Sequence, residues 1–150
     1  MAIHPPRTAH LMASPDDVEA QFYEALREAD LDKLMALWAD DDEVFCVHPG
    51  GPRVVGPQAI RLAFEAVFAS SGRIHVQPER VRRVHSIDSA VHNVVERVEL
   101  HTGEGLRTGY VVATNVYVKT SQGWRMVAHH ASPGTEQETP EIVDAPSVLH

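Results

Sequence analysis

Two polar side chains interrupt apolar segments of the chain, and both have types that suit proton transfer. His48 ends the β-prone segment 44–48 and precedes the turn-forming segment 49–52. An imidazole titrates near neutrality, so His48 could act as a general base, and the alternative is a histidine that hydrogen-bonds the adjacent turn. Asn115 lies within the β-branched segment 111–118, where an inward-facing amide needs a partner, either in a pocket or on the backbone of its own sheet.

Arg97 and Cys46 supply the next candidate groups. The planar Arg97 guanidinium suits a ligand carboxylate, and the alternative is an ion pair with Glu96, Glu99 or an acidic residue on a helix. Cys46 alternates with its strand neighbour and is expected to face a cavity. A nucleophilic thiolate would need a lowered pKa, which only the nearby His48 supports, so we expect a buried and inert thiol.

The histidines do not have the spacing of a metal site. Ten are present, but no two are separated by one or by three residues, as two ligands on one face of a strand or helix would be. His129 and His130 are adjacent on a predicted strand, so their side chains point to opposite faces and cannot line one cavity together. We therefore expect no metal and no other cofactor.

Charge and cysteine content exclude several classes of protein. The 150 residues carry 13 basic and 21 acidic side chains, a net charge of −8, which lacks the basic excess that nucleic-acid binding requires. Arg80, Arg82 and Arg83 form one short basic run, interpreted as the solvated face of a strand. No segment approaches the roughly 20 apolar residues of a membrane span. The opening segment does not resemble a secretory signal, and a single cysteine suits a reducing compartment, so we expect a cytoplasmic protein.

Three helices and one short strand are predicted in the first half of the chain. Apolar residues repeat at helical spacing over residues 16–28 and, with Asp30 as the N-cap, over residues 31–38. A proline near its start predicts a third helix over residues 57–70. The segment 44–48 is the short strand.

Four long segments of alternating polarity follow and predict strands at residues 74–84, 90–101, 106–120 and 124–132. The tight turns between them indicate an antiparallel meander, and Pro78 marks a bulge or bend in its first strand. Helices followed by such a meander predict an α+β fold, in which a curved, mostly antiparallel sheet forms a cone-shaped roll against three N-terminal helices.

One domain accounts for the length of the chain. We expect a flexible arm at residues 1–14, the domain at residues 15–133 and a flexible acidic tail at residues 134–150. The alternative for the tail is that one of its apolar pairs, at 142–143 or 148–149, packs on a partner subunit.

Several short motifs resemble the nuclear transport factor 2-like superfamily. They are ADLDKL at 29–34, LWADD at 37–41, GPQAI at 56–60, GWRMV at 123–127 and HHAS at 129–132. Within the superfamily, the ending resembles SnoaL-like domains and the association domain of calcium/calmodulin-dependent protein kinase II. The resemblance implies the cone-shaped fold but no single activity, because these relatives include both polyketide cyclases and a kinase oligomerisation module.

Ketosteroid isomerase, another member of the superfamily, uses a carboxylate base with a tyrosine and a protonated aspartate as hydrogen-bond donors. By resemblance, His48 stands at the position of the base and Asn115 at that of the aspartate. Phe22 stands at the position of the tyrosine, with Tyr23 one residue further along. The base has therefore changed type, one donor is replaced and one is lost.

The resulting hypothesis is a small-molecule pocket protein that could be a cofactor-independent isomerase or lyase for an apolar or oxygenated ligand. His48 would be the base and Asn115 the second catalytic group. The resemblance to the association domain implies that Arg97 and His130 face the pocket, and large side chains would complete its wall, although aromatic residues on such stripes are more often core. The predicted pocket-lining residues are Phe22, Trp38, Cys46, Phe64, Arg97, Tyr117 and His130.

The alternative hypothesis is a non-catalytic association module that forms a homodimer through the outer face of the sheet. This requires an uncovered apolar face, which alternating residues of one strand could supply. Those residues are Val112, Thr114, Val116 and Val118.

Overall fold

Two consecutive helices come first in the described part of the chain. Helix α2, Pro15–Glu28, starts at Ser14, whose hydroxyl accepts a hydrogen bond from the N–H of Asp17. The carboxylate of Asp30 caps helix α3, Leu31–Met35, in a similar way, so the chain turns between the two helices within a few residues. The computed structural model in which they are seen describes residues 12–70, 74–138 and 140–144.

A short β-hairpin and a third helix follow. Strand β1, Phe45–Val47, pairs antiparallel with β2, Arg53–Val55, which the sequence did not predict. This strand comes directly after the turn-forming segment 49–52 and is too short to show alternation. Helix α4, Pro57–Ser70, starts with its proline as predicted, and Gly56 before it has a φ of 93°, which glycine adopts without strain. All three predicted helices are present.

Four long strands complete the sheet: β3 Ile74–His85, β4 Ser89–Thr102, β5 Gly105–Thr120 and β6 Gly123–Ala131. The order across the sheet is β2-β1-β6-β5-β4-β3. Strands β1 and β6 run parallel, and the other neighbouring strands run antiparallel. A bulge follows Pro78 in β3, as predicted, and Arg80 adopts a positive φ of 43° within it.

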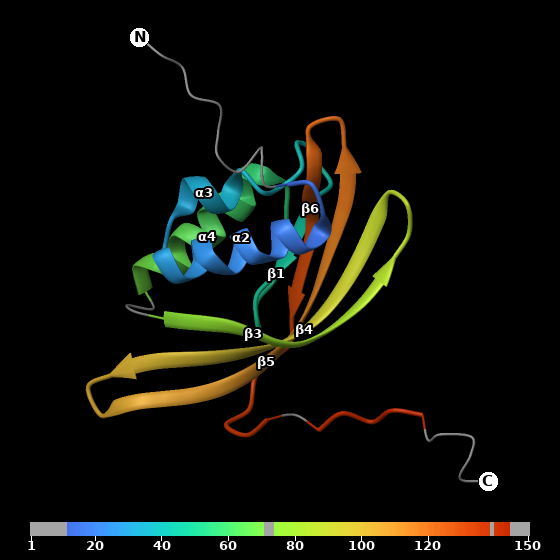
Figure 1. Cartoon of the computed structure of the whole chain (residues 1–150). Coiled ribbons are helices and arrows are strands. Elements are labelled where there is room, and N and C mark those ends of the chain that lie inside the picture. Colours follow the sequence, from blue (N-terminus) through green and yellow to red (C-terminus); the bar gives the residue numbers. More distant parts are fainter. Residues whose placement is uncertain (1–11, 71–73, 139, 145–150) are drawn as a thin grey trace, which may run out of the picture.

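The three helices cover one face of the curved sheet, and the C-terminal segment runs along the opposite side (Figure 1). Large side chains from both layers fill the space between helices and sheet, and each contributes about 1.5–3 kcal/mol by leaving water. They include Phe22, Tyr23, Leu34, Leu37, Ile60, Phe64, Tyr117 and Met126. The structure therefore confirms the predicted α+β class, with a curved and mostly antiparallel sheet against three helices.

The described part of the C-terminal segment lies against the sheet. Thr135 and Tyr110 exchange backbone hydrogen bonds of 2.9 and 2.8 Å. Most of the predicted arm at residues 1–14 and the apolar pair at 148–149 lie outside the described residues, so the boundaries of arm and tail stay predictions. Among the described helices, none is long and apolar enough to cross a membrane.

Candidate functional site

Four buried polar side chains form a continuous hydrogen-bonded row between helix α2 and the sheet. Tyr23, on α2, donates its hydroxyl hydrogen to Oε2 of Glu96, on β4, at 2.7 Å. Asn115, on β5, donates from Nδ2 to the Tyr23 hydroxyl at 3.0 Å. The Oδ1 of Asn115 lies 2.5 Å from Nδ1 of His129, on β6. These four residues, Glu96, Tyr23, Asn115 and His129, are called the buried polar row below.

The donor and acceptor types fix the direction of hydrogen-bond donation, which runs along the row from His129 toward Glu96. An amide oxygen can only accept, so Nδ1 of His129 carries the hydrogen of its bond to Asn115. The amide and the Tyr23 hydroxyl then each donate toward Glu96, which accepts with oxygen alone when it is ionised. Because aligned hydrogen bonds polarise one another, the row favours negative charge at its Glu96 end.

Burial sets the ionisation of the row. Glu96 is only 6% exposed, and desolvation raises its pKa to about 7, although the hydrogen bond from Tyr23 acts in the opposite direction. Desolvation, followed by the charges of His48 and His130, lowers the pKa of His129 to about 3. Burial and the charge of Glu96 raise the pKa of Tyr23 well above its usual value. Near neutral pH, both protonation states of Glu96 are populated, whereas Tyr23 and His129 are neutral.

His48 lies at the His129 end of the row. The centroids of the two imidazole rings are 6.3 Å apart, and His48 meets the ring of Phe64 edge-on at 4.7 Å. Burial lowers the pKa of His48, so the neutral imidazole is available as a proton acceptor. Its Nε2 is 3.7 Å from the Sγ of Cys46, whose pKa burial raises to about 12. The thiol is thus buried and protonated, which agrees with the expectation of an inert cysteine.

A second chain of polar groups runs from the core to the surface. Nδ1 of His92, on β4, contacts Oε2 of Glu19, on α2, and Nε2 of His92 lies 3.0 Å from Nε2 of the exposed His85. The ring of Tyr117 meets the His92 ring edge-on at 5.0 Å. The Tyr117 hydroxyl is buried near the Asn115 side chain, but it makes no hydrogen bond of ordinary geometry within the described residues. Within the same residues, no group of three or more His, Cys, Asp or Glu side chains could hold a metal ion.

The structure corrects the predicted orientation of Arg97 and His130. Both side chains are exposed, and His130 lines a groove on the outer face of the sheet, so neither joins His48 and Asn115 inside the roll. Arg97 instead forms an ion pair with Glu99 at 3.1 Å, which was the alternative drawn from the sequence. Their strand neighbours Glu96 and His129 occupy the inner positions.

Strand register explains both corrections. Residues directly opposite each other in adjacent strands share a face, and inward Asn115 lies opposite His92, so alternation along β4 turns Glu96 rather than Arg97 inward. The tight turn at 103–104 predicts the same pairing, because residues at equal distances before and after it lie opposite each other. The prediction for Arg97 did not use this signal. On β6, a bulge beside Val116 shifts the register by one residue and places His129 opposite Asn115.

The other predicted lining residues lie in the core. Phe22, Trp38, Cys46, Phe64 and Tyr117 are all buried among apolar neighbours. None of these five lines the cavity of about 720 Å³ that opens at the ends of α2 and α4, and their contact with a ligand stays a prediction. The structure brings His48 and Asn115 together through His129, and their catalytic roles also stay predictions.

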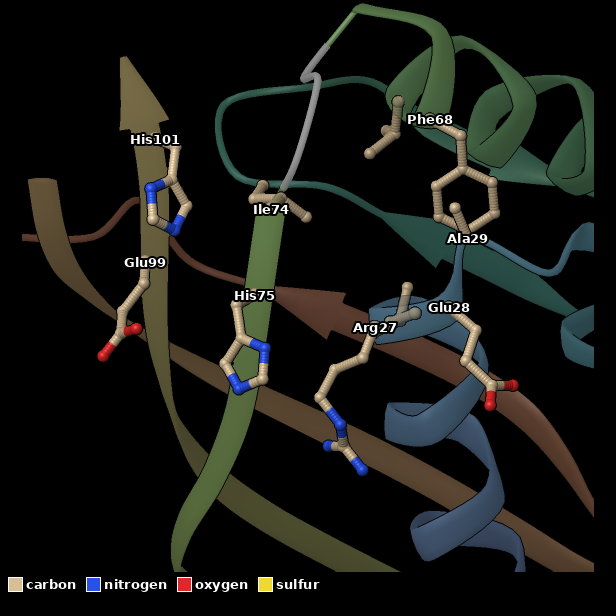
Figure 2. A pocket seen from close by; sticks show the side chains of 10 residues that line it. Arg27, Glu28, Ala29, Phe68, Ile74, His75, Glu99 and His101 are labelled. Atoms are coloured by element: carbon tan, nitrogen blue, oxygen red, sulfur yellow. The ribbon is translucent and has the colours of Figure 1, made fainter. Parts of the chain in front are cut away.

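A cavity of about 720 Å³ opens where the C-terminal ends of α2 and α4 meet the first residues of β3. Leu26, Phe68 and Ile74 contribute its apolar part, and Arg27 and His75 contribute polar side chains (Figure 2). The cavity lies close to both the buried polar row and His48. Its lining residue Leu26 is three residues after Tyr23, a member of the row, and Phe68 is four residues after Phe64, which contacts His48. Each lining residue is therefore about one helical turn, about 5.4 Å, further along its helix.

Comparison with known proteins gives consistent results. The SnoaL-like domain family matches residues 16–136. A solved structure from Thiobacillus denitrificans, provisionally assigned as a calcium/calmodulin-dependent protein kinase type II association domain, has 35% sequence identity and a TM-score of 0.75, and the match covers 82% of this chain and 97% of that chain. A provisionally assigned dehydratase of the NTF2-like family from Streptomyces avermitilis has 28% identity and a TM-score of 0.73, with coverages of 86% and 98%.

One curated relative is considerably longer than this chain. The F-box protein SKIP8 of Arabidopsis thaliana is 24% identical over 115 residues, which are 77% of this chain. The chain spans about half, 47%, of the length of that relative. The similarity therefore concerns one part of the plant protein.

Proposed function

Because this chain belongs to the SnoaL-like domain family, within the nuclear transport factor 2-like superfamily that its motifs predicted, we propose that it binds a small molecule inside the roll and exchanges a proton with it. Glu96 is the group that exchanges the proton, and Tyr23, Asn115 and His129 hold it in place. An isomerase or lyase that needs no cofactor fits this chemistry. The S. avermitilis relative, provisionally assigned as a dehydratase, supports this class.

The observation that carries the proposal is the buried Glu96 carboxyl at the end of a one-directional row. Buried ionisable groups often stabilise a fold less than apolar side chains of the same volume, so stability alone does not explain the row. General acids and bases work best when their pKa lies near the working pH, and burial raises the pKa of Glu96 to about 7. A perturbed carboxyl with an ordered set of donors is typical of a reactive site.

The geometry suggests how the proton would move. Because Oε2 of Glu96 accepts from Tyr23, Oε1 is the oxygen that can exchange a proton with a ligand. A protonated Oε1 can donate to a ligand oxygen, and an ionised one can remove a proton from a ligand carbon or hydroxyl. His48, the base that the sequence predicted, is a second proton acceptor at the other end of the row. Two such groups suit a reaction that removes a proton at one atom and returns one at another.

The cavity at the end of α2 is the proposed route of entry. Its volume of about 720 Å³ is in the usual range for small-molecule sites. Leu26 and Phe68 would contact an apolar ligand body, and Arg27 and His75 would contact its oxygen atoms. The proposed substrate class is therefore an apolar molecule that carries hydroxyl or carbonyl groups.

Native mass spectrometry of the purified protein, combined with thermal-shift binding of cyclic hydroxyketones, enones and phenols, tests this function. We expect a retained mass or a bound compound for the wild type and for Glu104→Gln, an exposed control in the β4–β5 turn. Glu96→Gln and His48→Ala should weaken binding or abolish turnover of that compound. Binding and turnover that are unchanged in both variants, or no binding by the wild type, would contradict the proposal.

A homodimer formed through the outer face of the sheet is a second candidate function. A groove of about 470 Å³ crosses β1, β5 and β6 on this face. Uncovered apolar grooves of this kind mark interaction sites, and the T. denitrificans relative is provisionally assigned as an association domain. The residues that line the groove are Phe45, Val112, Thr114, Val116, Ala128, His130 and Ser132.

Light scattering coupled to gel filtration tests the homodimer. We expect the mass of a dimer for the wild type and that of a monomer for Val116→Asp, which buries a carboxylate in the interface. Leu62→Asp on α4 is the control, because Leu62 is an exposed apolar residue on the helical side of the fold. A wild type that is monomeric at about 100 µM would exclude a stable homodimer.

A further inference from the structure

Three side chains connect the core to the surface and have no part in the function proposed above. Glu19, on α2, and His92, on β4, are 6% and 0% exposed, whereas His85, the last residue of β3, is exposed. Oε2 of Glu19 contacts Nδ1 of His92, and Nε2 of His92 lies 3.0 Å from Nε2 of His85. These three residues, called the histidine chain below, therefore link a buried carboxyl group to water.

The two imidazole rings of the histidine chain meet end to end. Their planes are 16° apart, and their centroids are 5.2 Å apart, which is close to the largest separation that a 3.0 Å contact between two Nε2 atoms allows. Ligands of one metal ion would instead direct both nitrogens toward a common third point. The contact is therefore a hydrogen bond between the rings, in which one nitrogen donates and the other accepts.

The Glu19 carboxylate determines which nitrogens carry hydrogen. An ionised carboxylate only accepts, so Nδ1 of His92 donates to Glu19, and Nε2 of the neutral His92 ring accepts from Nε2 of His85. This arrangement leaves the lone pair of the exposed His85 ring on its Nδ1.

A proton that water gives to Nδ1 of His85 can move inward in two transfers. The N–H bond at Nε2 of His85 breaks as one forms at Nε2 of His92. The N–H bond at Nδ1 of His92 then breaks as an O–H bond forms at Oε2 of Glu19. Both rings end neutral in their other tautomer, and the reverse transfers return the proton to water.

One further ion pair faces the histidine chain. Oδ1 of Asp16, on α2, lies 4.0 Å from Nε2 of His92 and 2.8 Å from Nε of Arg83, on β3. The charge of Arg83 offsets that of Asp16, so the carboxylate of Glu19 is the one that directly holds the His92 ring.

The inner end of the histidine chain lies beside the buried polar row. On α2, Glu19 comes about one helical turn before Tyr23. On β4, His92 is four residues before Glu96 and faces the same side of the sheet. Burial and then the charge of Glu19 raise the pKa of Tyr117, and the charge of Glu96 raises it further, so Tyr117 lies in the field of both carboxyl groups.

We propose that the histidine chain carries protons between water and the interior of the roll, with Glu19 as its inner end. The proposal rests on the function proposed above, because a carboxyl group that gives its proton to a ligand must be reprotonated, and Glu96 is buried. The other end of the buried polar row does not take up protons near neutral pH, because burial lowers the pKa of His129 to about 3. An imidazole at the surface suits proton uptake, since it titrates in this range.

Infrared spectroscopy tests the path in the full chain without any ligand. A protonated carboxyl group has a carbonyl band that an ionised one lacks, and the band of Glu19 is the one that Glu19→Gln removes. An equilibrium titration gives the pH at which this band appears in the folded protein. Light-triggered release of a proton from a caged acid then gives the rate at which the band appears.

We expect His85→Gln to slow this rate at least about tenfold, because an amide can hydrogen-bond His92 but does not relay protons. Val84→Ala, at the exposed neighbour of His85, is the control and should keep the wild-type rate. A purely structural role of His85 predicts the opposite change, because a loosened contact would let water reach Glu19 sooner. Imidazole added to His85→Ala should restore part of the rate by replacing the missing ring.

The outcomes separate this proposal from the proposed function. An unchanged or faster rate in His85→Gln, or a Glu19 band that never appears while the protein is folded, overturns the proton path. If circular dichroism shows that His85→Gln does not fold, the comparison of His85→Ala with and without imidazole decides. Because these rates need no ligand, unchanged binding and turnover in Glu96→Gln and His48→Ala would contradict the proposed function alone.

Discussion

Replacing Glu96 by glutamine should change how the stability of the protein depends on pH. Burial raises the pKa of Glu96 from 4.5 to about 7, so the folded state holds a proton that the unfolded state has released. This contribution to stability is complete below pH 4.5 and is lost as the pH rises through about 7. Glutamine has nearly the same shape as glutamate, can still accept the hydrogen bond from Tyr23 and cannot ionise. The substitution therefore removes only the titration of the side chain at position 96.

The magnitude follows from the size of the shift. One pKa unit corresponds to about 1.4 kcal/mol, so the Glu96 contribution amounts to about 3 kcal/mol. His129 acts in the opposite direction, because its pKa falls from 6.5 to about 3 and its contribution is lost as the pH falls below 6.5. The two effects offset each other in the wild type over much of the range between pH 4.5 and pH 6.5. The difference in the free energy of unfolding between variant and wild type isolates the contribution of Glu96, because both proteins retain His129.

Urea unfolding of wild type, Glu96→Gln and the Glu104→Gln control, at a series of pH values from about 5 to about 8.5, measures this difference. The free energy of unfolding of Glu96→Gln should rise relative to the wild type by about 3 kcal/mol across this series. Thermal unfolding should show the same trend, at about 2–4 °C for each kcal/mol. A difference that stays constant with pH would refute the reasoning, since Glu96 would then ionise alike in the folded and unfolded states.

Three further substitutions test single contacts. Tyr23→Phe removes a hydroxyl that both donates and accepts, so it should lower the free energy of unfolding by about 1–3 kcal/mol, measured by urea unfolding. Tyr117→Phe removes a buried hydroxyl that makes no hydrogen bond of ordinary geometry within the described residues and should leave that free energy unchanged or raise it by about 1 kcal/mol; a loss as large as that of Tyr23→Phe would contradict this. Gly134→Ala would place a Cβ 2.2 Å from the Tyr110 carbonyl oxygen, so the Tyr110 amide should exchange its hydrogen faster than in the wild type, and unchanged protection in hydrogen-exchange mass spectrometry would contradict the contact.

The order of elements could be read from the sequence because each has a local signal. Helix α2 has its cap and apolar stripe, α4 has its proline, and the long strands alternate between turns. Strand β2 has no such signal, because three residues after a turn cannot display a period. Pairing partners decide whether so short a segment becomes a strand, and here Val54 is held opposite Cys46.

The face on which each polar residue lies was harder to predict. On β4 both alternating sets contain valine, so hydrophobicity alone did not show whether Glu96 or Arg97 points inward. The turn to β5 held that information, because pairing across a hairpin fixes the register. On β6 the choice between His129 and His130 depends on the bulge beside Val116, and no residue type in the sequence marks it.

Alternation along β6 places two neighbouring histidines in different surroundings, and the bulge beside Val116 sets which of them faces inward. His129 ends the buried polar row, whereas His130 lines the groove on the far side of the sheet. The two residues are adjacent on the strand, so a slip of β6 by one residue would exchange the two imidazoles between the interior and the groove.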